Sequence, residues 1–293
     1  AEVLAATPGT VTRGGAGRRD TRSWRRGREL RAWHPGPPEV GDDVVSPDME
    51  DAVVAAAFHH RGDAGRSLTI SAPPSEPREG VLVRTSSLTR RFGSTVALDD
   101  VSVEVRSGEI VGVIGANGAG KTTLIRLLLG LLTPSAGDIV LFGEPPSRTS
   151  RHLVGYVPQG LGLYRDLTVS ENLSFVATAY GRPAPPQADL AQVADDLVGE
   201  IGLGRQRRLA FACALSHAPA LLVLDEPTSG VDPISRARLW DTIHEQAEAG
   251  VGVLVSTHHM QEAEQCDRLV LMDLGRVVAD GRPRDVIGAS LRR

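Results

Sequence analysis

The chain has 293 residues, of which 41% are hydrophobic and 23% charged, an ordinary composition for a globular protein of one large domain or two modest ones. A formal net charge of −4 argues against general nucleic-acid binding as the main activity. The apolar runs fall short of the ~20 residues that a membrane-spanning helix needs, and the first residues do not resemble a secretory signal, so we expect a cytoplasmic chain.

The composition changes near residue 80. Residues 1–80 are rich in Gly, Pro and Arg, with a basic cluster between Arg18 and Arg31, and they have little strand or helix periodicity. We interpret this stretch as an N-terminal extension with solvated arginines, rather than as a patch that contacts phosphates or lipids. Three prolines between Ser71 and Arg78 are typical of a linker.

Strand and helix patterns alternate from Val81 onward. The expected strands are residues 81–83, 101–105, 109–114, 139–142, 154–157, 220–224, 251–256, 268–272 and 277–279. The expected helices are residues 124–129, 168–180 with a capping box at the start, 188–200, 205–216 and 232–249, with a short helix at the end of the chain. This order predicts an α/β fold with a mixed or parallel core sheet, an antiparallel β edge and a site at the carboxyl ends of the central strands.

Residues 115–123 match the phosphate-binding pattern G-x-x-x-x-G-K-[ST] between an apolar strand and a helical run. The glycines let successive backbone N–H groups point at phosphate oxygens, and the helix N-terminus adds its positive dipole end. We expect Lys121 to reach the terminal phosphates and the Thr122 hydroxyl to ligate Mg²⁺. The alternative is a Gly-rich turn beside a solvated lysine. The predicted nucleotide contacts are Gly115, Ala116, Asn117, Gly118, Ala119, Gly120, Lys121, Thr122 and Thr123.

Two carboxylates, Asp225 and Glu226, follow the apolar run 220–224. A strand beside the phosphate loop would let Asp225 hold Mg²⁺, directly or through water. Glu226 is then positioned to polarise the attacking water as a general base. Without the phosphate loop, a pair of solvated acids would be an equally good interpretation.

His258 and Gln159 are further candidates for the same site. His258 follows the strand 251–256, where an imidazole can contact the γ-phosphate, and Gln159 can contact Mg²⁺ and the attacking water from a loop. A lone histidine is more often structural, and a lone loop glutamine carries no signal, so both assignments depend on the surrounding pattern.

The order of these motifs resembles that of an ATP-binding cassette (ABC) ATPase over about residues 81–283. The resemblance lies in residues 115–122, Gln159, Leu-Asp-Glu-Pro at 224–227, Ser-Gly-Val-Asp at 229–232 and Ser-Thr-His at 256–258. It implies a P-loop NTPase cassette over residues 81–293 that uses ATP and Mg²⁺, with a short helical subdomain at about 160–216. It also implies that Phe92 stacks on adenine and that Asp232 signals across a cassette dimer, although a lone Phe is more often core and an Asp before Pro is an ordinary helix cap.

The family signature Leu-Ser-Gly-Gly-Gln is altered. The aligned residues are Ile201-Gly-Leu-Gly-Arg205, so Gly202 and Leu203 replace the serine and the first glycine that face the partner's γ-phosphate. Gly204 and the helix N-terminus remain as anion-binding features. A deletion that removed the signature, with residues 198–203 belonging upstream of it, is the alternative. Because two cassettes bind ATP head to tail, we expect unequal sites.

The resemblance implies the ATP-hydrolysing subunit of a membrane exporter, partnered by a permease and a second cassette in a homodimer or heterodimer at the inner face of the cell membrane. A catalytically weak regulatory cassette and a soluble ABC ATPase acting on ribosomes or DNA are the alternatives. Residues 47–54 resemble the closing segment of exporter cassettes. Residues 1–60 are therefore either the tail of a preceding cassette or a disordered extension.

Overall fold

A computed structural model describes residues 10–14, 23–27, 29–34, 43–46, 51–52, 54–55, 78–183, 187 and 190–290. The chain divides into two compact units. The first comprises residues 1–69 with 230–244, and the second comprises residues 70–229 with 245–293.

The first unit contains an antiparallel sheet in the order β1-β3-β2. Its strands are β1 (Thr10–Gly14), β2 (Ser23–Arg26) and β3 (Glu29–His34). Trp24 and Trp33 are buried in its small core, and the Trp24 indole donates a hydrogen bond of 3.0 Å to the buried carboxylate of Asp51. The unit also includes most of helix α7 (Pro233–Glu248). The expectation of little regular structure before residue 80 is therefore wrong for these three strands.

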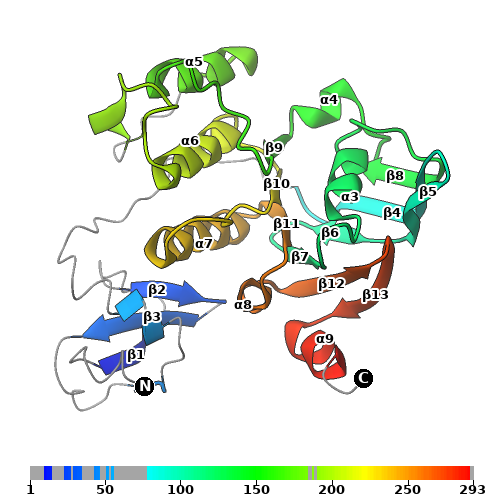
Figure 1. The fold of residues 1–293 in the computed structure, drawn as a ribbon, viewed down its shortest axis with the longest axis horizontal. Helices are drawn as coiled ribbons and strands as arrows, with labels where there is room; N and C mark the ends of the chain where they lie inside the picture. The colour runs from blue at the N-terminus through cyan, green and yellow to red at the C-terminus, as the bar shows by residue number, and fades with distance from the viewer. Residues whose placement is uncertain are drawn as a thin grey trace. The chain divides into compact units, whose positions relative to one another are not determined.

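The second unit is built on a six-stranded sheet in the order β13-β12-β7-β11-β10-β9 (Figure 1). All neighbours are parallel except β12 and β13, which are antiparallel. The strands are β7 (Ile110–Ile114), β9 (Val154–Val157), β10 (Leu221–Asp225), β11 (Gly252–Thr257), β12 (Arg268–Asp273) and β13 (Arg276–Gly281). Every residue of β7, β10 and β11 is buried, as expected for parallel strands covered on both faces. The predicted parallel core is confirmed.

The antiparallel edge centres on one long strand, β4 (Val81–Phe92). It pairs with β5 (Thr95–Val101), β6 (Glu104–Arg106) and β8 (Ala136–Leu141). The predicted single strand at 101–105 is wrong, because the buried Thr85 hydroxyl donates to the Val101 carbonyl and accepts from the Val103 N–H. This side chain occupies the place of a ladder bond and separates β5 from β6.

Several helices of the second unit pack against its strands, and two of them pair to form a lobe. The helices of this unit are α3 (Lys121–Leu128), α4 (Arg148–Arg151), α5 (Val169–Ala179), α6 (Leu203–Leu215), α8 (Met260–Ala263) and α9 (Pro283–Ser290). Figure 1 shows α5 and α6 side by side in the lobe, and α9 beside β12 and β13. The capping box between Thr168 and Glu171 is present at the start of α5, as the sequence predicts.

The predicted helix at residues 188–200 is wrong for the described residues. Only a short 3₁₀ turn, Ala191–Val193, forms there. The carbonyls of Ala194 and Asp196 instead accept the N–H groups of Ser170 and Val169 at the start of α5. A continuous helix through 188–200 would keep those carbonyls for its own bonds.

A stack of aromatic rings joins the C-terminal ends of α5 and α6 to the sheet. The rings of Tyr180 and His217 are parallel with their centroids 3.7 Å apart, and His152 meets Tyr180 edge-on at 5.5 Å. The His217 Nε2 lies 3.2 Å from the Val154 carbonyl oxygen. Burial lowers the pKa of His217 from 6.5 to about 4, although the hydrogen bond to Val154 opposes the shift.

We expect the stability of the second unit to fall as the pH decreases from 6.5 to 4. In this window the unfolded chain binds a proton that the folded His217 does not, so the full stability is present above pH 6.5. The loss should reach about 3 kcal/mol at the low end. His217→Phe keeps the ring stack and removes this titration. Urea unfolding at a series of pH values should give a flatter profile for the variant, and parallel profiles would contradict the prediction.

Among the residues that the structure describes, no helix combines the length and the apolar character needed to cross a membrane.

Candidate functional site

The loop between β7 and α3 has the backbone geometry of a phosphate cradle. Gly118 and Gly120 have φ values of 85° and 104°, in the left-handed region that favours glycine. A Cβ on Gly120 would lie 2.7 Å from Leu98 and 2.8 Å from the Ala97 carbonyl, so no larger residue fits. Residues 116–118 are exposed, and in the described chain no side chain caps the first turn of α3. The backbone N–H groups of residues 116–118 and of the first turn of α3 are therefore available to an anion.

Lys121 is the first residue of α3 and is 5% exposed. Its ammonium donates hydrogen bonds to the Gly115 carbonyl at 2.7 Å and the Ala116 carbonyl at 3.2 Å. These bonds keep a buried cation in the curve of the loop, where phosphate oxygens would meet it.

Asp225 ends β10 beside this loop. One carboxylate oxygen accepts a bond of 3.0 Å from the Thr122 hydroxyl, and the other accepts a bond of 2.5 Å from the Ser256 hydroxyl. Asp225 and Ser256 are register partners at the carboxyl ends of the parallel strands β10 and β11. The topology therefore brings together residues more than a hundred positions apart, as the strand–loop–helix pattern predicts.

Glu226 is the centre of the polar cluster. Its carboxylate lies 3.7 Å from the Lys121 ammonium, 3.2 Å from the His258 ring nitrogen Nδ1 and 3.2 Å from the Gln159 amide nitrogen. Its backbone has a φ of 51°, an uncommon value for a residue with a side chain. The structure thus brings together six predicted residues, Lys121, Thr122, Gln159, Asp225, Glu226 and His258.

The residues present fit a nucleotide with Mg²⁺. The loop offers backbone donors and a buried ammonium to phosphates. Thr122 and Asp225 place a hydroxyl and a carboxylate side by side, and oxygen ligands of this kind suit Mg²⁺.

Three predicted residues stay outside this cluster. Phe92 ends β4 with 45% of its surface exposed, and the Arg90 guanidinium lies 4.5 Å above its ring. Gly204 lies in the first turn of α6. Asp232 belongs to the other unit, where its carboxylate accepts bonds from the backbone and hydroxyl of Ser235 at the start of α7.

Sequence reasoning missed two residues of the site. Ser256 also accepts the Glu226 N–H at 3.1 Å, so its hydroxyl links both carboxylate residues. A polar residue at the end of an otherwise apolar strand was the available signal. Arg207, buried on α6, donates to backbone carbonyls of the segment that follows β10. A single arginine on an apolar helix face was the signal there.

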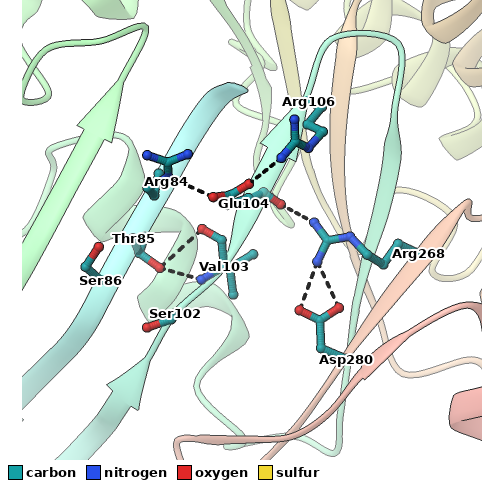
Figure 2. Close-up of a pocket in the computed structure, with 9 residues that line it drawn as sticks. All are labelled: Arg84, Thr85, Ser86, Ser102, Val103, Glu104, Arg106, Arg268 and Asp280. Atoms are coloured by element: carbon teal, nitrogen blue, oxygen red, sulfur yellow. Dashed lines mark hydrogen bonds and ion pairs between the residues drawn. The ribbon is translucent and has the colours of Figure 1, made fainter. Parts of the chain in front are cut away.

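A separate cavity of about 470 Å³ opens on the antiparallel edge (Figure 2). Three arginines line it, and each is matched by an acceptor. Arg84 and Arg106 bind Glu104 at 2.7 and 3.1 Å, and Arg268 binds both oxygens of Asp280 at 2.8 and 2.9 Å. These ion pairs join β4, β6, β12 and β13 around the cavity. The cavity is distinct from the phosphate loop.

The fold and the cluster define the second unit as a P-loop nucleoside triphosphatase. The family model described as ABC transporter matches residues 98–229. The chain is 38% identical over 269 residues to "Probable multidrug ABC transporter ATP-binding protein YbhF" of Escherichia coli K12, covering 86% of this chain and 46% of that protein. It is 42% identical over 219 residues to "Nod factor export ATP-binding protein I" of Burkholderia lata, covering 70% of this chain and 72% of that protein. The chain belongs to the ABC transporter family, and its second unit is an ATP-binding cassette.

Solved structures agree with this assignment. An ATP-binding subunit of an ABC transporter superposes with a TM-score of 0.66 at 31% identity, covering 72% of this chain and 94% of the other. The cbiO1 protein of Clostridium perfringens, part of the ABC transporter complex cbiONQ, superposes with a TM-score of 0.62 at 27% identity, covering 72% of this chain and 92% of the other. The chain spans about half the length of YbhF, and the alignment between the two covers 86% of the chain.

Proposed function

We propose that this chain is the ATP-hydrolysing component of a membrane exporter. The observation that carries the proposal is the convergence of Lys121, Gln159 and His258 on the Glu226 carboxylate beside the Thr122–Asp225 pair. Relatives named for multidrug transport and Nod factor export support the exporter branch.

The proposed chemistry follows from these side chains. Lys121 and the loop N–H groups bind the phosphates and neutralise their charge. Mg²⁺, held by Thr122 and Asp225 with Gln159 nearby, would supply further charge neutralisation when bound. Glu226 accepts the proton of the attacking water, and His258 donates to the γ-phosphate. Phe92 stacks on adenine through its exposed face.

The proposed partners are a separate permease and a second cassette. ATP would clamp two cassettes together, and hydrolysis with product release would reopen them and move the permease. Gly204 and the start of α6 would face the partner's γ-phosphate, and Asp232 would lie in the segment between the sites. The protein would then act at the inner face of the cell membrane through its permease.

An altered signature favours a second candidate, a weak regulatory cassette within an asymmetric pair. Leu203, which is 41% exposed at the start of α6, replaces a glycine there, and Gly202 offers no hydroxyl. The intact residues Lys121, Asp225 and Glu226 favour hydrolysis instead.

We further propose that residues 1–60 are the tail of a preceding cassette. The YbhF alignment covers 86% of the chain. The 213 residues that follow residue 80 are a smaller share of the 293, so the alignment extends into the residues before 80. The three-stranded sheet in this region, with its buried Trp24–Asp51 bond, also favours a folded element over a disordered extension.

Hydrolysis of Mg-ATP at a series of protein concentrations tests the function. A rate that rises as the square of concentration is expected if the chain pairs with itself, because two cassettes complete each site. Lys121→Ala should abolish the rate and weaken ATP binding, since the buried ammonium is lost. Binding of ATP without turnover would support the asymmetric pair, whereas an absence of ATP binding in the unmodified chain would contradict both candidates.

A further inference from the structure

A buried arginine forms hydrogen bonds with backbone carbonyls at and after Glu226. Arg207 lies in the second turn of α6 and is 5% exposed. Its guanidinium donates to the carbonyls of Glu226 at 3.3 Å and Pro227 at 2.5 Å, and also to the carbonyl of Ser229. One side chain therefore satisfies three carbonyls of a four-residue turn, residues 226–229, which we call the catalytic turn.

The catalytic turn needs such support. Glu226 has a φ of 51°, in the left-handed region that is sterically unfavourable for a residue with a side chain. Residues in such conformations persist only where their surroundings hold them. The Glu226 N–H is held by the backbone and the hydroxyl of Ser256, and the carbonyl of the same residue is held by Arg207. The direction of the Glu226 side chain depends on this backbone.

The turn is also bound from α8, the short helix that follows His258. The Thr228 hydroxyl donates to the carboxylate of Glu262, which is 2% exposed. Burial lowers the pKa of Arg207, and the charge of Glu262 opposes that shift. Two opposite charges therefore flank the catalytic turn, Arg207 from α6 and Glu262 from α8.

We propose that Arg207 is a positioning residue that fixes the Glu226 carboxylate for proton abstraction and ties it to the second turn of α6. The inference rests on the proposed hydrolytic function and adds a residue that the family motifs do not include. It acts through hydrogen bonds to backbone carbonyls, whereas Lys121, Gln159 and His258 surround the Glu226 carboxylate.

Arg207→Met tests the proposal because it keeps the length of the side chain and removes all donors. Asn172→Ala is the matched control. Asn172 is also buried, and its amide donates to the three carbonyls of Tyr164, Leu167 and Thr168 at 2.9, 3.4 and 2.9 Å, in a loop that does not include the catalytic turn.

Amide hydrogen exchange gives a readout that does not depend on turnover. In Arg207→Met, exchange in a peptide that spans residues 226–229 should rise about tenfold or more, and the same peptide should be unchanged in Asn172→Ala. Arg207→Lys keeps a charge but not the forked donors, and should give an intermediate rate. Unchanged exchange in Arg207→Met would overturn the proposal.

Kinetics separate positioning from folding. We expect Arg207→Met to lower kcat by about tenfold or more with little change in the Kd for ATP. In a Glu226→Gln background the same substitution should lower the residual rate no further, because the base that it positions is already lost. A loss of equal size in both backgrounds would assign Arg207 a purely structural role. An inactive unmodified chain would count against the proposed function, and the exchange result would still decide the role of Arg207.

Discussion

Glu226→Gln is expected to lower ATP turnover by on the order of 10²- to 10⁴-fold while leaving ATP binding nearly unchanged. An amide of the same size keeps an oxygen for the Gln159 amide donor and a polar group beside the His258 ring nitrogen, each of which lies 3.2 Å from the present carboxylate. It cannot accept a proton from water. The phosphates would still meet Lys121 and the loop N–H groups, so nucleotide affinity should persist.

The measurement is single-turnover hydrolysis together with the Kd of a fluorescent ATP analogue. Glu144→Gln is a suitable control, because Glu144 is exposed in the loop after β8 and the substitution removes the same charge. Turnover within about threefold of the unmodified chain would exclude Glu226 as the general base. A loss of ATP binding would instead assign it to nucleotide binding.

Restoring the signature with Gly202→Ser and Leu203→Gly is expected to raise hydrolysis by about 10- to 100-fold in a self-paired cassette, because preorganised donors would again face the partner's γ-phosphate. The structure accommodates both changes. Gly202 is the N-cap of α6 with φ −62° and ψ 150°, which suits a serine, and a Cβ there has nothing within 4 Å. Leu203 is 41% exposed, so its removal costs little packing.

The rate should be compared with that of Leu131→Gly, which removes a leucine that is 57% exposed outside the signature. A faster double variant with an unchanged control would confirm that Ile201–Arg205 occupies the position of the signature. Equal rates in all three proteins would reject the unequal-site hypothesis and favour the alternative in which the signature is deleted.

The parts of the site that depend on strand ends were predictable from sequence. Continuous apolar runs become β7, β10 and β11, and their parallel pairing alone puts Asp225, Ser256 and the phosphate loop at one edge. The grouping of Gln159 and His258 around Glu226 follows from the same edge. Long-range side-chain contacts were not predictable: nothing local in the sequence pairs Arg207 with carbonyls about twenty residues away.

Three errors in the predicted fold have the same origin. The composition of residues 188–200 suits a helix, but the carbonyls of Ala194 and Asp196 accept hydrogen bonds from the start of α5 instead. The run 101–105 suits a strand, yet the Thr85 hydroxyl interrupts its ladder. The strands β1, β2 and β3 were missed because arginines dilute their alternation, while Trp24 and Trp33 supply the small core. In each case tertiary partners outweigh local propensity.

Helix α6 is fastened at both ends of its buried length. Arg207 holds it to the catalytic turn, and His217, two residues after the last turn, holds it to Tyr180 and the Val154 carbonyl. These two attachments oppose rotation of α6 about either of them. Four residues of α6, 203–206, precede Arg207, which corresponds to a length of about 6 Å. Because Arg207 lies so close to the exposed start of α6, a displacement of the catalytic turn would have to displace that end of the helix with it.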